Sequence, residues 1–441
     1  MGYLDNILFV ILIAIGFGYF AINVRKLIRN IKLGQPVDRN DNPGLRWKNM
    51  TLIALGQKKM FRKPIPAVLH LIVYAGFIII NLELLEIIID GIFGTHRIFR
   101  FMGGFYSFLI GSFEILAALV LVAVITFLIR RNVIRLWRFI HSDLRGWPKR
   151  DANYILLFEV VLMTLFLLMN AADYHLQNLP DGVGHYYKAG AYPISSLIAP
   201  IFEGMPASTV ILMERTFWWL HIAGILFFMN YLYYSKHLHI LLAFPNTYYA
   251  DLTPKGKFRN LESVTNEVKL MLDPNADPFA AAPVDAAPSK FGASDVMDLH
   301  WVQLLNAYTC TECGRCTSAC PANITGKKLS PRKIMMDTRD RLEEVGRNID
   351  KNKGTFVPDN KMLLDDYITR EELWACTSCN ACVEECPVNI DPLSIIMDMR
   401  RYLVMEQSAA PMSLNAMMSN VENNGAPWQY SQLDRLNWKD N

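Results

Sequence analysis

Cysteine is missing from most of this chain, because none occurs before residue 310 and none after residue 386. A disulfide framework in the first 309 residues is therefore excluded, and a reducing environment around the C-terminal half is expected. The sequence also lacks a G-x-G-x-x-G fingerprint and a basic stripe with interleaved aromatics, and its net charge is only +3. Dinucleotide-dependent hydride transfer and nucleic-acid binding are therefore not expected.

Long apolar runs are absent from residues 246–441, whereas five occur before them. The five runs are Leu4–Val24, Ile65–Ile89, Phe105–Ile129, Tyr154–Ala172 and Thr216–Tyr234. Each is close to the ~20 residues that a helix needs to cross a bilayer. The sequence thus predicts an all-α membrane bundle of five transmembrane helices over residues 1–245, followed by soluble segments.

Basic residues are few in two of the loops between these runs, and this asymmetry predicts the orientation of the bundle. The loops after the first and third runs are rich in Lys and Arg. In contrast, the loop after the second run has only Arg97 and Arg100, and segment 173–213 has only Lys188. We therefore expect a multi-pass protein of a bacterial or archaeal cytoplasmic membrane, with its N-terminus outside and its C-terminal half in the cytoplasm. Within the long outer segment, Tyr192–Phe202 is expected to form a short interfacial or re-entrant piece.

The eight cysteines form two copies of one pattern. The first copy is Cys310-x-x-Cys313-x-x-Cys316-x-x-x-Cys320-Pro321, and the second is Cys376-x-x-Cys379-x-x-Cys382-x-x-x-Cys386-Pro387. In the bacterial ferredoxin pattern, three cysteines of one motif bind one 4Fe-4S cluster and the fourth crosses to the other cluster. One cluster is therefore expected on Cys310, Cys313, Cys316 and Cys386, and the other on Cys376, Cys379, Cys382 and Cys320. Zinc is a poor alternative, because structural zinc sites take cysteines in pairs.

The segments around the cysteines favour a mostly α-helical two-cluster ferredoxin-like domain over residues 299–406. Helices are expected at Leu329–Val345, Ile368–Trp374 and Leu393–Met405. Residues 246–298 are expected to contain a short amphipathic helix at Gly256–Leu272 and an extended linker at Asp273–Asp295, which is rich in Ala, Pro and Asp. The polar tail at 407–441 is expected to wrap a partner or this domain.

Histidines in apolar runs are costly and indicate function. His70 is expected in the cytoplasmic third of the second run, His221 in the outer third of the fifth run, and His239 at the cytoplasmic end of that helix. His221 and His239 are eighteen residues apart, which is five full helical turns, so we expect both to lie on one face of that helix, ~27 Å apart along its axis.

We expect His70 and His239 to hold haem b between two imidazoles. A second haem on His221 is an open alternative, although the second run offers no histidine at that depth. Interfacial snorkelling or helix–helix hydrogen bonding is the other explanation for these histidines, and it is the better one for His237.

Two carboxylates, Glu83 and Glu114, are expected at a depth similar to that of His221. Quinone chemistry needs proton-carrying groups beside the ring oxygens, so these three residues are candidates for a quinone site. The alternative is that each carboxyl is protonated or paired with a neighbouring helix. Glu159, in the fourth run, has no assigned role.

Residues 1–245 resemble the gamma, haem b-bearing subunit of respiratory nitrate reductase. The resemblance rests on the five runs, the outside N-terminus, and the pair His221 and His239 with the sequence Ser235-Lys236-His237-Leu238-His239. Two features depart from that subunit, namely the missing outer histidine of the second run and the fused cysteine domain. Residues 300–405 resemble the cluster-bearing half of the D-type subunit of heterodisulfide reductase. The fusion resembles membrane-bound heterodisulfide-reductase-like proteins and electron-transfer-flavoprotein:menaquinone oxidoreductases.

These resemblances imply a membrane-bound electron-transfer subunit that joins a cytoplasmic redox partner, two 4Fe-4S clusters, haem b and the menaquinone pool. The partner would be a CCG-type iron-sulfur subunit, a flavoprotein or a dehydrogenase. This sequence has no CCG repeat, so a catalytic cluster is expected on another subunit. Two alternatives stay open: a membrane anchor of a larger complex with structural clusters, and a heterodisulfide reductase-like enzyme that works with a separate catalytic CCG subunit.

Overall fold

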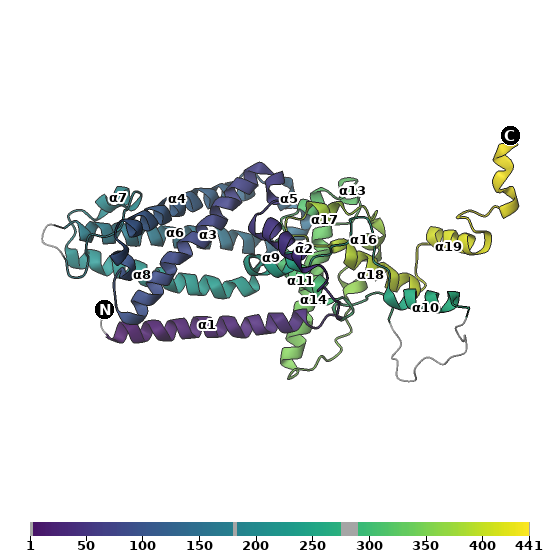
Figure 1. Ribbon diagram of the computed structural model, residues 1–441, viewed down its shortest axis with the longest axis horizontal. Helices are drawn as coiled ribbons and strands as arrows, with labels where there is room; N and C mark the ends of the chain where they lie inside the picture. The colour runs from purple at the N-terminus through teal and green to yellow at the C-terminus, as the bar shows by residue number, and fades with distance from the viewer. Residues whose placement is uncertain (1–2, 180–182, 275–289, 441) are drawn as a thin grey trace.

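The computed structural model describes residues 3–179, 183–274 and 290–440, and in these residues it is built from helices without a β-sheet. A bundle of long helices forms one end of an elongated molecule, and the cysteine domain forms the other end (Figure 1). This arrangement confirms the predicted fold class.

Five helices are long and apolar enough to cross a membrane. They are α1 (Tyr3–Ile31), α3 (Pro64–Phe93), α4 (Gly104–Asn132), α6 (Trp147–Gln177) and α8 (Ala207–Tyr231), the last prolonged by the 3-10 turn η6 (Leu232–Tyr234). Helix α6 packs along α8 and α4, and α3 packs along α4, whereas α1 contacts α3 and α8. Many large apolar side chains of these helices face outward, as expected for a surface that contacts lipid.

Glycines set the closest approaches within the bundle. A Cβ added at Gly76 of α3 would lie 2.5 Å from Val120 of α4, and one added at Gly224 of α8 would lie 2.8 Å from Leu162 of α6. Small residues let membrane helices approach closely, and close packing is a main source of their association. These two positions therefore fix the spacing of the helix pairs α3–α4 and α6–α8.

The fifth transmembrane helix does not continue to His239, so the expectation that His221 and His239 share one helical face is wrong. The chain leaves η6 through Ser235, whose φ of −117° and ψ of 148° are extended, and then forms η7 (Lys236–Leu238) and α9 (His239–Tyr248). The Ser235 side chain accepts a hydrogen bond from the His237 N–H, which caps the new turn. His239 is thus the first residue of a separate helix.

Short elements cover both ends of the bundle. At the end that holds the N-terminus, η3 (Ile98–Met102), α7 (Ser195–Ile198) and η5 (Ala199–Phe202) form small helical turns, the last two within the predicted short piece (Figure 1). The loops at the other end contain α2 (Pro43–Asn49), η1 (Met50–Leu55), η2 (Met60–Arg62), α5 (Trp137–Ile140) and η4 (Ser142–Leu144). These loops lie between the bundle and the cysteine domain.

The cysteine domain consists of η8 (Val296–Asp298) and eight helices: α11 (Trp301–Thr309), α12 (Arg315–Ser318), α13 (Pro321–Ile324), α14 (Pro331–Lys351), α15 (Leu363–Asp366), α16 (Arg370–Ala375), α17 (Ala381–Glu385) and α18 (Pro392–Met405). Helices α14, α16 and α18 correspond to the three that the sequence predicts. Their inward side chains form one apolar core, in which α14 packs against α11 and α18.

The predictions for the two segments that flank this domain compare differently with the structure. The expected amphipathic helix is α10 (Glu262–Leu272), and most of the predicted linker, 275–289, lies outside the described residues. The tail forms α19 (Met412–Asn424) and η9 (Gln432–Lys439), neither of which has a buried residue, and it runs away from the domain (Figure 1). The tail therefore does not wrap this domain, and the other expectation, that it wraps a partner, stays a prediction.

Candidate cofactor sites

The two cysteine motifs fold into loops with the same backbone pattern. In each motif the third and fifth positions have positive φ, with values of 55° at Glu312 and 74° at Gly314, and of 58° at Ser378 and 59° at Asn380. For residues with a Cβ, this conformation costs on the order of 1–3 kcal/mol and persists only where the surroundings fix it. A strained loop that occurs twice in one chain indicates that both copies shape the same kind of site.

The four cysteines predicted for the first cluster lie around one pocket, which Cys382 also lines: Cys310, Cys313, Cys316 and Cys386. Burial, with nearby Glu312 and the neighbouring thiols, raises the pKa of Cys310 to about 12. The thiolates therefore need a compensating positive charge, which bound iron provides because a coordinating thiol is deprotonated. The Ile390 N–H donates to Cys386 Sγ over 3.3 Å, as is common where hydrogen bonds to sulfur tune a cluster. The residues fit a 4Fe-4S cluster.

The remaining cysteines form a second group. Burial raises the pKa of Cys376, and the charges of Cys320 and Cys379 raise it further. Cys382 interacts in the same way with Cys376 and Cys320, so the four thiols lie near one another. Cys379 is exposed, whereas Cys320 and Cys382 of the same group are buried, as are Cys310 and Cys386 of the first group. The second group thus reaches the surface of the domain at Cys379.

The first group lies against the end of the bundle opposite the N-terminus. Arg315 Nη1, between two of its cysteines, donates to the Lys59 carbonyl over 3.3 Å. Arg332 Nη1, from the pocket wall, donates to the Arg138 carbonyl over 2.8 Å. Lys59 follows α2 and η1, and Arg138 lies in α5, so two loops at this end of the bundle bind the site. The cysteine domain is therefore bound directly to the helix bundle and is not held only by the connecting chain.

The rings of His70 and His239 face each other across a gap of the size of a metal centre. Their centroids are 6.4 Å apart, with an angle of 44° between the rings. Metal–nitrogen bonds of ~2.0 Å on both sides place two trans imidazole centroids roughly 6 Å apart. His70 Nδ1 lies 3.1 Å from Gln57 Oε1, and His239 Nδ1 lies 3.1 Å from the Lys236 carbonyl.

These contacts occupy Nδ1 of both rings and leave each Nε2 free for a metal. The pair His70 and His239 therefore fits an axial haem ligand set. His237 packs beside this pair, since its ring lies 5.4 Å from both His239 and Phe228. Burial lowers the pKa of His237 to about 3, so this imidazole is neutral at pH 7.

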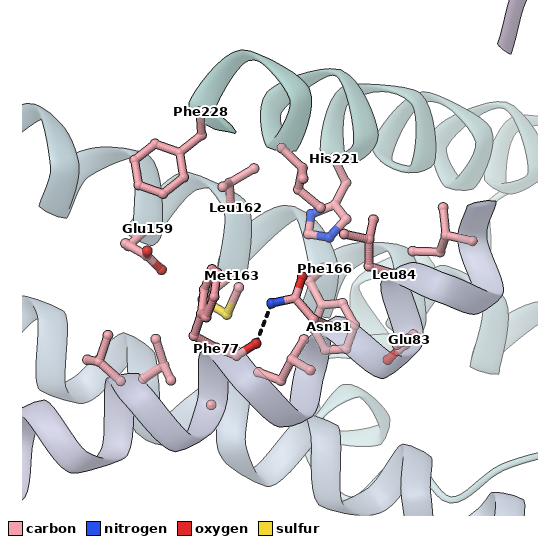
Figure 2. Close-up of a pocket in the computed structure, with 16 residues that line it drawn as sticks. Phe77, Asn81, Glu83, Leu84, Glu159, Leu162, Met163, Phe166, His221 and Phe228 are labelled. Atoms are coloured by element: carbon pink, nitrogen blue, oxygen red, sulfur yellow. Dashed lines mark hydrogen bonds between the residues drawn. The ribbon is translucent and has the colours of Figure 1, made fainter. Parts of the chain in front are cut away.

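His221 lies elsewhere, in a cavity of about 90 Å³ between α3, α6 and α8 (Figure 2). This is far more than the ~10–15 Å³ that one water needs. Glu83 and Glu159 line the same cavity, which is otherwise mainly apolar. His221 Nδ1 and Glu83 Oε2 are buried without a hydrogen-bond partner among the described residues. Unpaired polar atoms that face a cavity suit a polar ligand.

Glu114 is not brought to this cavity. Its Oε2 accepts hydrogen bonds from the backbone N–H groups of Ile194 and Ser195, over 3.0 and 3.1 Å, at the start of α7. It therefore anchors the outer segment. Glu159, to which the sequence assigns no role, is the carboxyl that shares the cavity with Glu83. Only the cavity between α3, α6 and α8 identifies it.

Residues 309–390 match the protein family described as the 4Fe-4S dicluster domain. Two relatives align with nearly the whole chain. The "Probable iron-sulfur-binding oxidoreductase FadF" of Bacillus subtilis is 28% identical over 99% of this chain and 61% of its own length. The "EtfAB:quinone oxidoreductase" of Syntrophomonas wolfei is 26% identical over 92% of this chain and 55% of its own length. The chain thus spans less than two thirds of either relative.

A shorter match supports the predicted likeness to heterodisulfide reductase. The D-type subunit of the dihydromethanophenazine:CoB–CoM heterodisulfide reductase of Methanosarcina mazei is 25% identical over 33% of this chain and 35% of its own length. The likeness to the nitrate reductase gamma subunit stays a prediction, and no solved structure matches the chain. The chain is therefore a membrane protein with a 4Fe-4S dicluster domain whose relatives are iron-sulfur oxidoreductases.

Proposed function

We propose that this chain is a membrane-bound electron-transfer subunit that connects a cytoplasmic redox partner with the membrane quinone pool. Two 4Fe-4S clusters and one haem b would supply one-electron transfer when bound. The first cluster would be held by Cys310, Cys313, Cys316 and Cys386, the second by Cys376, Cys379, Cys382 and Cys320, and the haem by His70 and His239.

One observation carries this proposal: each imidazole of the histidine pair is tied to the first cysteine motif through a single short segment. The backbone carbonyl of Lys236 contacts His239 Nδ1. The side-chain ammonium of Lys236 pairs with Glu312, which lies between Cys310 and Cys313 in the sequence. On the other side, the segment 57–59 carries Gln57, which contacts His70, and Lys59, whose carbonyl binds Arg315. The protein thereby holds the two candidate cofactor sites in one fixed arrangement.

The positions of the candidate cofactor sites suggest which partners this protein has. The exposed Cys379 makes the second cluster site the natural point of contact for a soluble donor. A flavoprotein fits best, because the relative from Syntrophomonas wolfei bears the name EtfAB:quinone oxidoreductase. A dehydrogenase or a CCG-type iron-sulfur subunit is the other kind of partner. The Lys- and Arg-rich loops adjoin the cysteine domain, which favours a cytoplasmic location for that domain and an outside N-terminus.

The cavity with Glu83 and His221 is the proposed quinone site, with menaquinone as the expected substrate. A ring oxygen near Glu83 Oε2 and His221 Nδ1, which have no hydrogen-bond partner among the described residues, can exchange protons as electrons arrive or leave. His221 then serves the quinone, and no second haem is required.

The match to the D-type subunit of a heterodisulfide reductase favours a second function. In that case the chain would deliver electrons to a disulfide-reducing CCG subunit. A purely structural anchor is the other alternative, in which the clusters would not turn over.

The test uses the purified full chain. Iron, acid-labile sulfide and pyridine-haem assays should give the amounts of two cubane clusters and one haem. Addition of a menaquinol analogue should then reduce the haem and clusters, as followed by absorbance and EPR. Protein that contains only zinc and no sulfide would refute the proposal, and cofactors that menaquinol leaves oxidised would favour the anchor.

A further inference from the structure

Glu83 lines two cavities at once. Besides the cavity that holds His221, it borders a second cavity of about 20 Å³ toward the outer end of the bundle. This is enough for one water, which needs ~10–15 Å³. Asp173 and His96 line the second cavity as well. The unpaired Oε2 of Glu83, a residue that is only 2% exposed, therefore stands where a proton can pass from one cavity to the other.

The second cavity is lined by more acids than bases. Its wall contains five carboxyl groups but only two arginines and one histidine: Glu83, Glu86, Asp90, Asp173, Glu214, Arg97, Arg215 and His96. Burying uncompensated charges is expensive, so these carboxyl groups cannot all be ionised together. The wall therefore holds protons that its members can exchange.

Arg97 keeps the two nearest carboxyl groups in place. Its Nη1 donates to Glu83 Oε1 over 2.9 Å, and its Nε donates to Asp173 Oδ2 over 3.0 Å. Arginine does not lose its proton in proteins, so it positions these groups and a proton must move through the cavity water. On the far side of Asp173, His96 Nε2 lies 3.5 Å from Oδ1.

The last step reaches the surface. The rings of His96 and His185 are 4.9 Å apart, and His185 is exposed. Proton-binding groups thus occur at intervals between the His221 cavity and the end of the molecule opposite the cysteine domain.

We propose that Glu83, Asp173, His96 and His185 conduct protons between the quinone cavity and the membrane face opposite the cysteine domain. This inference rests on the proposed quinone function. One quinol is oxidised to one quinone, its two electrons leave toward the cysteine domain, and its two protons leave along this path. In the reverse reaction, the electrons arrive from the cysteine domain and the protons arrive along the path.

Vesicles containing the full chain and a long-chain menaquinol test the direction of proton release. External ferricyanide cannot cross the bilayer, so it oxidises only molecules whose cysteine domain faces outward, and each quinol reduces two ferricyanides. With valinomycin and potassium present to dissipate the membrane potential, a pH dye inside the vesicles should report two protons per quinol in the lumen. Protons that appear only outside would overturn the proposal. Absence of any ferricyanide reduction would instead refute the quinone function itself.

Variants test the path. Glu83→Gln and His96→Ala should each lower the rate of menaquinol oxidation about 10- to 100-fold, within the range of lost acid–base assistance. Added imidazole should restore part of the rate of the His96→Ala variant in detergent, an effect that a merely structural defect would not show. Glu203→Gln, which alters an exposed carboxyl in the same outer segment, should leave the rate unchanged. Unchanged rates for both path variants, with normal haem and cluster spectra, would contradict the path.

Discussion

Single residues in this protein serve two sites through different atoms. Lys236 offers its carbonyl to His239 and its ammonium to Glu312, so one residue links a proposed haem ligand with a cysteine loop. Similarly, the side-chain oxygen of Gln57 contacts Nδ1 of His70. Partners of this kind orient a ligand and set its tautomer, which is why their loss is felt at the metal.

Gln57→Leu should therefore weaken haem binding by about 10- to 100-fold, since His70 loses the acceptor that fixes its Nδ1–H. Haem content by the pyridine assay and the low-spin EPR signal are the measurements. Gln57→Glu, which keeps an acceptor oxygen at this position, is the matched control and should retain the haem. Equal haem content in both variants would show that the hydrogen bond does not matter.

Replacing single cysteines by serine distinguishes the two clusters. Cys386→Ser should remove or convert only the cluster whose other ligands are Cys310, Cys313 and Cys316, because the fourth cysteine crosses over. Cys379→Ser should affect only the other cluster. EPR of the reduced proteins distinguishes the outcomes, and a Cys386→Ser protein that loses the signal affected by Cys379→Ser would mean that the motifs do not cross.

At the scale of elements, the cap of α11 connects folding with pH. The His300 Nδ1 accepts a hydrogen bond from the Gln303 N–H, and α11 leads directly into Cys310. Burial, with Arg39 and Arg259 nearby, lowers the pKa of His300 to about 3. The unfolded chain binds a proton at ~6.5, so this residue makes the fold less stable as the pH falls from ~6.5 toward 3.

His300→Asn keeps an N-cap acceptor but removes the titration. The stability of the variant relative to the wild type should therefore rise by up to about 1.4 kcal/mol per pH unit below ~6.5. Thermal unfolding followed by circular dichroism at pH 6.5 and 5.5 provides the comparison. A constant difference in Tm between the two proteins at both pH values would contradict this role.

How far the sequence predicts these elements depends on whether the determining contacts are local. Apolar runs predict all five candidate membrane helices, whereas the crossed grouping of the eight thiols that cysteine spacing predicts stays a prediction. The break at Ser235 escapes prediction because the apolar pattern and the helical spacing of His221 and His239 both continue across it. The positions of Glu114 and Glu159 are likewise set by contacts between distant segments, which periodicity within one helix does not contain.

At the scale of the whole molecule, buried ion pairs hold the cysteine domain on the bundle. Arg332 in α14 donates to Asp143 in η4 over 3.0 Å, and both side chains are almost fully buried. Asp143→Asn leaves the arginine charge uncompensated, which costs about 3–5 kcal/mol when such a pair is buried. We expect the docking of the domain to loosen.

The measurement compares two rates in the Asp143→Asn protein. Reduction of the clusters by dithionite should be normal, whereas reduction of the clusters by menaquinol through the haem should be at least about 10-fold slower, because electron transfer depends on a fixed distance. Glu371→Gln alters the exposed ion pair of the cysteine domain between Glu371 and Lys328 and should change neither rate. Normal menaquinol reduction in the Asp143→Asn protein would show that docking does not depend on this pair.

The exposure of Cys379 has a consequence for the stability of the clusters in air. The exposure that would let the proposed donor approach would also admit dioxygen and peroxide, which attack accessible sulfur and iron. Oxidative damage should therefore begin at the cluster farthest from the membrane, and the chain would lose contact with its donor while its bilayer-side cofactors were still intact. A bound donor would shield this weak point.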